Sequence, residues 1–75
     1  MFEPNAMNAA MLNVPLGTVV TVQLADDPSR SINVTVTDRG PYAVGRVIDL
    51  TLTAFRTLVG NLDVGLVKVK VIGPR

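Results

Sequence analysis

Cysteine, histidine and tryptophan are absent from this chain of 75 residues. Without cysteine the protein has no disulfide bond and no thiolate nucleophile, and the redox state of its compartment is left open. Without histidine it also lacks the commonest general base and the commonest metal ligand in proteins. We therefore expect neither a metal site nor a cofactor.

The chain also lacks a strong charge of either sign. It has 7 basic and 6 acidic residues, a net charge of +1, and no cluster of basic residues. Proteins that bind nucleic acid neutralise phosphates with such clusters, so nucleic acid is not an expected partner. No apolar run approaches the roughly 20 residues that a membrane span needs, and no targeting segment is recognisable.

Aromatic residues make up only 4% of the chain, although 48% of it is hydrophobic. Valine, leucine and isoleucine must therefore fill the interior, and β-branched residues favour strands. A chain of this length forms one domain, residues 1–75, and buries about 60% of its unfolded surface on folding.

Apolar and polar residues alternate along residues 18–25 and 31–37, with a turn between them. This period of two is typical of half-buried strands and predicts a hairpin or a meander pair. Further strands are expected at 46–50 and 66–72. Lysines on the outer face of the last segment suit an exposed edge strand.

A helix is predicted over residues 52–59, because hydrophobic residues recur there at helical spacing, namely Leu52, Phe55, Leu58 and Val59. Thr51 is a suitable N-cap, and Gly60 suits the position just after the helix. Residues 1–14 are the least regular part of the chain, and within them the pattern of Ala6–Leu12 leaves a short helix and a twisted strand both open. Four strands and one short helix favour a mainly β domain, a compact barrel with short connections.

The loop Arg39-Gly40-Pro41-Tyr42 follows the second predicted strand. Continuing the alternation of that strand places Asp38 on the apolar face, just where the strand ends. A carboxylate in this position has two interpretations. It accepts hydrogen bonds from the loop backbone, as in Asx turns, or it acts as a general acid.

Several segments of the chain resemble, in order and at suitable spacing, those of the rare lipoprotein A family. They are Asn5–Ala10, Leu12–Thr18, Asp38–Tyr42, Gly45–Thr51 and Gly65–Val71. The resemblance implies a small six-stranded double-psi β-barrel. It also implies a lytic transglycosylase, which cleaves the glycan strands of peptidoglycan without water, and a location in the cell envelope or outside the cell.

The same resemblance implies that Asp38 is the catalytic acid and base, and it matches Asp49 to an acidic residue of related barrels, so both are candidate catalytic residues. Arg39, Arg46 and Tyr42 are candidate substrate-binding residues, because guanidinium groups bind carboxylates and hydroxyls and a tyrosine ring stacks on a sugar. Structural interpretations stay open for each. The arginines could pair with the two aspartates, Tyr42 could cover the barrel end, and Asp49 could cap the helix or act as a buried acceptor.

Two departures from the family matter. The family has a histidine where this chain has Met11, so a catalytically silent domain that binds polysaccharide, or a purely structural barrel, is the alternative. The first strand of the family lies before residue 1, which leaves either a trimmed chain or a gap in the sheet that the N-terminal segment or another chain fills. If another chain fills it, a homo-oligomer is expected. A glycan-acting domain should gather Asp38, Asp49, Arg39 and Tyr42 on one open groove, whereas an interaction domain should expose an apolar patch.

Overall fold

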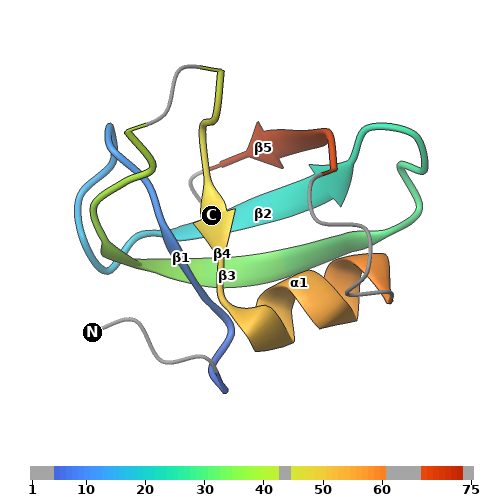
Figure 1. Ribbon diagram of the computed structural model, residues 1–75, viewed down its shortest axis with the longest axis horizontal. Helices are drawn as coiled ribbons and strands as arrows, with labels where there is room; N and C mark the ends of the chain where they lie inside the picture. Colours follow the sequence, from blue (N-terminus) through green and yellow to red (C-terminus); the bar gives the residue numbers. More distant parts are fainter. Residues whose placement is uncertain (1–4, 43–44, 61–66, 74–75) are drawn as a thin grey trace.

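The computed structural model describes residues 5–42, 45–60 and 67–73. These ranges contain β1 (Asn8–Ala10), β2 (Val19–Leu24), β3 (Ser31–Asp38), β4 (Asp49–Leu50), α1 (Leu52–Val59) and β5 (Val69–Ile72). The strands form a single curled sheet in the order β4-β1-β3-β2-β5, and α1 packs beneath it (Figure 1). The prediction of a mainly β domain with one short helix is confirmed.

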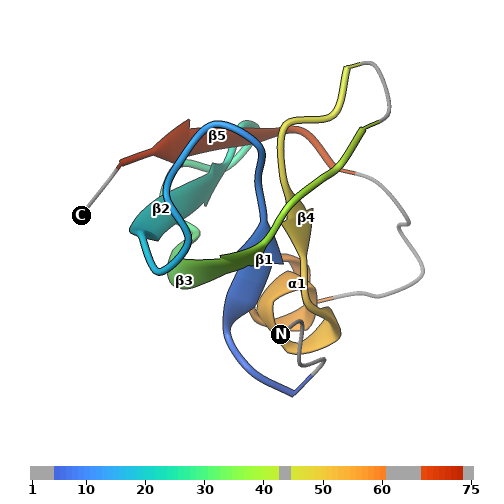
Figure 2. The same ribbon diagram turned by 90° about the vertical axis from the view of Figure 1, so that its left-hand side faces the viewer.

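Strand β1 gives the sheet its only parallel pair among the described strands. It runs parallel to β3, whereas β4 is antiparallel to β1 and β2 is antiparallel to both β3 and β5. Figure 2 shows β1 and β4 side by side, away from β2 and β5. The N-terminal segment, which the sequence left open between helix and strand, thus enters the middle of the sheet as a strand.

Strands β2 and β3 form the expected antiparallel hairpin, paired from Val19 with Thr35 to Gln23 with Ser31. Their connection is held by Asp27, whose Oδ1 accepts a hydrogen bond from the Ser29 hydroxyl at 2.6 Å and another from the Ser29 N–H at 3.2 Å. An aspartate that bonds its own backbone two residues on is a common turn-forming device.

The core lies between the sheet and α1. Alternate residues of the two long strands and two residues one helical turn apart face each other there: Val20, Val22, Val34, Val36, Ala54 and Leu58, each 0–1% exposed, together with Ala9 of β1. A period of two on the strands and a spacing of four on the helix therefore bury one continuous layer of side chains.

Helix α1 begins and ends where the sequence predicted. The Thr51 side chain accepts a hydrogen bond from the N–H of Ala54, and Gly60 adopts φ 86° and donates its N–H to the carbonyl of Arg56 at 2.7 Å. The prediction of which helix residues pack against the sheet is wrong in part, because Leu52 is 51% exposed. Ala54 lies in the core in its place, since Ala54 and Leu58 are four residues apart and share a helix face.

Two expected strands are shorter than predicted. Strand β4 contains only Asp49 and Leu50, and Arg46 lies before it, with its guanidinium paired to Asp49, three residues on. Strand β5 begins at Val69, and Lys70 is exposed on this edge strand as expected. The predicted strand start at Leu66 and the predicted turn at 62–65 lie outside the described residues. Of the helical segments described, none has the length and apolar character to cross a membrane.

Candidate functional site

Asp38 is the last residue of β3 and lies half-buried at the end of the sheet. Its carbonyl accepts a hydrogen bond from the N–H of Met11 at 3.1 Å, which ties the strand end to the segment that follows β1. Its carboxylate Oδ2 accepts a hydrogen bond from the hydroxyl of Thr37 at 3.0 Å. The side chain is therefore oriented by its neighbour at a strand end that is partly open to solvent.

The sheet register places the two candidate residues Asp38 and Asp49 at the same level of the sheet, on one rung of its hydrogen-bond ladder. Ala10 of β1 is paired with Asp38 on one side and with Asp49 on the other. Neighbouring strands lie about 4.8 Å apart, so the two aspartate backbones are separated by roughly 10 Å. The register of β1 against β3 shifts by one residue between Ala9 and Ala10, so Thr37 has no partner in β1. The sequence offers no local signal for this proximity, because the strand that joins the two aspartates comes from the far N-terminal end of the chain.

Asp49 is fixed by an ion pair. Its Oδ1 accepts a hydrogen bond from the guanidinium of Arg46, and both side chains are partly exposed, at 36% and 43% respectively. An exposed pair of this kind contributes about 0.2–1 kcal/mol to stability. The helix-cap interpretation of Asp49 is wrong, because Thr51 caps α1.

Arg39 points back toward the N-terminal half of the chain. Its Nη1 donates to the carbonyls of Met11 at 3.2 Å, Leu12 at 3.3 Å and Val14. Three carbonyl acceptors on one nitrogen hold the 11–14 segment against the start of the loop after β3. This arrangement gives Arg39 a structural role beside Asp38.

The loop after Asp38 covers Ala10. Gly40 is buried with φ 133°, a backbone conformation that strongly favours glycine. A Cβ atom at Gly40 would lie 4.0 Å from the Cβ of Ala10 and 3.8 Å from Cε2 of Tyr42. The loop therefore lies close over the rung that carries both aspartates. Tyr42 itself is 78% exposed, so its ring is presented to solvent and does not seal the sheet end.

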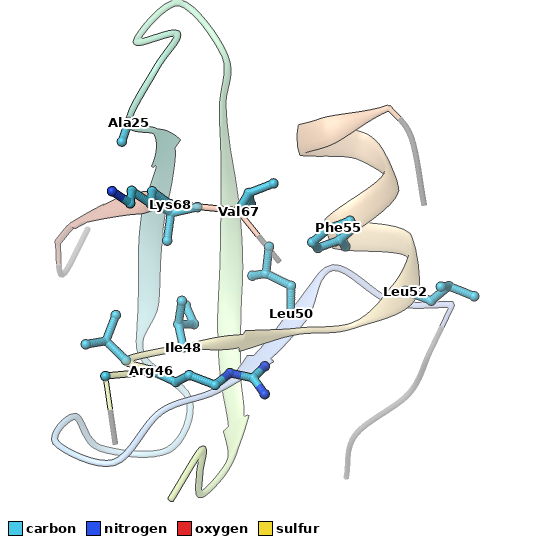
Figure 3. Close-up of a pocket in the computed structure, with 11 residues that line it drawn as sticks. Ala25, Arg46, Ile48, Leu50, Leu52, Phe55, Val67 and Lys68 are labelled. Atoms are coloured by element: carbon cyan, nitrogen blue, oxygen red, sulfur yellow. The ribbon is translucent and has the colours of Figure 1, made fainter. Parts of the chain in front are cut away.

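A separate cavity of about 960 Å³ lies between the two edge strands. We call it the β4–β5 groove; it is lined by Ala25, Gly45, Arg46, Val47, Ile48, Leu50, Leu52, Phe55, Val67, Lys68 and Val69. Figure 3 shows Ile48 and Leu50 on the β4 side and Phe55 on α1, with Val67 and Lys68 on the segment that leads into β5. Of the predicted site residues only Arg46 lines this groove, so the structure does not gather Asp38, Asp49, Arg39 and Tyr42 in it.

Two residues of the site were missed as functional positions in the sequence. Ala10 carries no reactive group, and only the sheet register reveals that it separates Asp38 and Asp49. Thr51 was identified as a helix cap, but it is also completely buried, and its hydroxyl donates to the carbonyl of Ala6. Among the residues described, no three acidic side chains come together in a way that could hold a metal ion.

The family model described as lytic transglycolase matches residues 1–71 of the chain. This chain belongs to the lytic transglycolase family. Membership confirms the double-psi β-barrel class that the sequence motifs implied. The described strands form an open sheet, in which β4 and β5 are the outer strands.

Several curated proteins are similar to this chain over most of its length. It is 43% identical over 74 residues to the probable endolytic peptidoglycan transglycosylase RlpA of Nostoc sp. (strain PCC 7120), a match that covers 96% of this chain and 19% of the relative. It is 42% identical over 72 residues to the endolytic peptidoglycan transglycosylase RlpA of Pseudomonas aeruginosa (strain PAO1), covering 96% and 20%. The Yersinia pestis protein of that name is 46% identical over 54 residues, covering 72% and 15%. The chain thus spans about a fifth or less of the length of these relatives.

Proposed function

We propose that this domain acts on the glycan strands of peptidoglycan and cleaves them by lytic transglycosylation, with Asp38 as general acid and base. The observation that carries the proposal is the position of Asp38, half-buried at the end of β3 and on one rung with Asp49. Membership of the lytic transglycolase family and the names of the curated relatives support the same substrate. A location in the cell envelope or outside the cell follows from that substrate.

One carboxyl group suffices for this chemistry. In its protonated form Asp38 gives its proton to the glycosidic oxygen as the bond between that oxygen and the anomeric carbon breaks. The resulting carboxylate then takes a proton from a hydroxyl of the same sugar, whose oxygen attacks the anomeric carbon and closes an anhydro ring. No water is consumed, in contrast to glycoside hydrolases that use two carboxyl groups.

Asp49 is the proposed second carboxylate. Its backbone lies roughly 10 Å from that of Asp38, on the other side of β1. The ion pair with Arg46 holds its position, so we assign it to stabilise the positive charge that develops on the sugar ring. Tyr42 is exposed and is proposed to stack on a neighbouring sugar, whereas the contacts of Arg39 favour a role in shaping the loop.

A second candidate function is binding of peptidoglycan without cleavage. Histidine is absent from the whole chain. Met11 occupies the position at which the rare lipoprotein A family has its histidine. Without that partner, the proton transfers would depend on the carboxylates alone. The same residues would then hold a glycan strand and not cut it.

The test is incubation of the 75-residue chain with peptide-free glycan strands, followed by mass spectrometry for anhydro-ended products. General acid catalysis contributes about 10²–10⁴-fold, so Asp38→Asn should lower the rate by that factor. Asn keeps an oxygen that can accept the Thr37 hydroxyl, so the fold should survive. The matched control is Asp26→Asn, because Asp26 lies in the exposed turn after β2. This variant should cleave the glycan strands as fast as the unchanged chain.

Each other result has a distinct meaning. If glycan strands bind but yield no anhydro-ended products, the function is binding without cleavage, the second candidate. If the Asp38→Asn variant forms these products as fast as the unchanged chain, Asp38 is not the general acid. A chain that neither binds nor cleaves the strands would reject both functions.

A further inference from the structure

A β-bulge lies at the end of β3, directly beside the candidate general acid. Ala9 of β1 is paired with Val36. The next residue of β1, Ala10, is paired with Asp38, which leaves Thr37 as an extra residue of β3. One extra residue reverses the face to which the following side chain of a strand points. The direction of Asp38 therefore follows from its partner in β1 and not from the alternation along β3.

Asp38 shares the face of Ala10, which is turned away from the core. Residues paired across neighbouring strands point to the same face of a sheet, and successive residues of one strand point to opposite faces. Ala9 is completely buried and belongs to the core, so Ala10 points to the other face, where the loop at Gly40 covers it. The alternation of β3 predicted the core face for Asp38, and that prediction is wrong because of the bulge.

A hydrogen bond between neighbouring side chains supports this direction. The Thr37 hydroxyl donates to Oδ2 of Asp38 at 3.0 Å. Thr37 follows the fully buried core residue Val36, so it also points away from the core. In a regular strand the next side chain would point to the opposite face and would be out of reach of this hydroxyl. The bulge therefore sets two successive polar side chains side by side on one face.

Asp49 points to the same face as Asp38. Ala10 is also paired with Asp49, and Ala9 is paired with Leu50, which packs against the core. Without the extra residue in β3, the two carboxylates would lie on opposite faces of the sheet. Bulges occur beside active sites for this purpose, since they re-aim a side chain without changing the rest of the strand.

We propose that Thr37 is a positioning residue for the general acid. The bulge turns the Asp38 carboxyl group onto the face that carries Asp49, and the Thr37 hydroxyl holds that group in one rotamer, so the scissile bond is approached from the face opposite α1. This inference rests on the proposed role of Asp38 in cleavage. Thr37 acts through Asp38, so loss of its hydroxyl should lower kcat and leave KM unchanged.

The first test measures the formation of anhydro-ended products from peptide-free glycan strands. Thr37→Val removes the hydroxyl and keeps the shape of the side chain. It should lower kcat about 10–100-fold, because a misplacement of about 1 Å at a reacting group costs up to about 100-fold. Thr37→Ser keeps the hydroxyl and should restore most of kcat. The matched control is Thr35→Val, the same replacement two residues earlier on the same face of β3, which should leave kcat unchanged.

The second test does not depend on cleavage. Three-bond couplings between Hα and the two Hβ atoms of Asp38 report its side-chain rotamer in the labelled 75-residue chain. They should indicate one rotamer in the unchanged chain, in Thr37→Ser and in Thr35→Val. In Thr37→Val they should become an average over several rotamers.

The two tests separate this inference from the proposed function. If no chain cleaves but the couplings change as described only in Thr37→Val, the cleavage proposal fails and the positioning of the carboxyl group by Thr37 stands. If Asp38→Asn abolishes cleavage while Thr37→Val retains both kcat and the couplings, Asp38 is the acid and the role of Thr37 is refuted. A loss in Thr37→Ser as large as in Thr37→Val, or a raised KM with unchanged kcat, would also overturn it.

Discussion

Replacing Thr51 by valine should remove a large part of the stability of this domain. The hydroxyl is completely buried and makes contacts in three directions. It donates to the carbonyl of Ala6, and it accepts hydrogen bonds from the N–H of Ala54 at 3.3 Å and the N–H of Asn8 at 3.4 Å. It thus connects the N-terminal segment, β1 and α1. Valine keeps the shape of threonine, so the variant isolates the loss of the hydroxyl.

The expected loss adds two contributions. Removal of a threonine N-cap costs about 1 kcal/mol, and a buried polar group left without a partner costs about 1–3 kcal/mol. The sum is roughly 2–4 kcal/mol, whereas domains have about 0.05–0.15 kcal/mol of stability per residue, or roughly 4–11 kcal/mol at this length. The melting temperature should fall by at least about 10 °C.

Urea denaturation followed by circular dichroism measures the free energy of unfolding. Thr51→Ser keeps the hydroxyl and loses a buried methyl group, so it should cost about 1 kcal/mol. Thr57→Val is the second control, because the Thr57 hydroxyl is exposed and bonds only within α1, to the carbonyl of Thr53. It should change stability by less than about 0.5 kcal/mol. If Thr51→Val were no more destabilising than Thr51→Ser, the hydroxyl would not be the link between these elements.

Two further variants test the core and the loop. Leu58→Ala should cost about 2–5 kcal/mol in urea denaturation, because it leaves a cavity in a fully buried site between α1 and the sheet; a loss below about 1 kcal/mol would show that α1 does not close the core. Arg39→Met removes the donor to the carbonyls of Met11, Leu12 and Val14 and should cost about 1 kcal/mol. Hydrogen exchange of the Met11 amide should become faster in this variant, and an unchanged rate would contradict the clamping role.

The guanidinium of Arg46 pairs with Asp49 on the rung of the candidate active site, and the side chain of Arg46 also lines the β4–β5 groove. Replacement of Arg46 would therefore change the groove as well as the candidate active site. Asp38 does not line the groove, so it is the better position for a test of cleavage.

Much of the local structure was predictable from the sequence because its causes are local. The alternation of residues 18–25 and 31–37 predicted the hairpin, and the cap residues Thr51 and Gly60 predicted both ends of α1. The loop motif that begins at Asp38 predicted the family, which the family model confirms. Each of these signals depends on residues close together in the chain, where backbone preferences and hydrogen bonds are decided.

The way in which distant parts of the chain meet depends on the assembled fold. Residues 8–10 have no decisive periodicity, and they form a strand because β3 and β4 offer backbone partners on both sides. That insertion places Asp38 and Asp49 on either side of Ala10. Likewise, the exposed position of Leu52 depends on how the whole helix packs against the sheet. Pairing across a sheet and packing of a helix depend on partners far away in the chain. The sequence therefore determined the hairpin and the capped helix α1, while the assembled sheet determined β1 and the site.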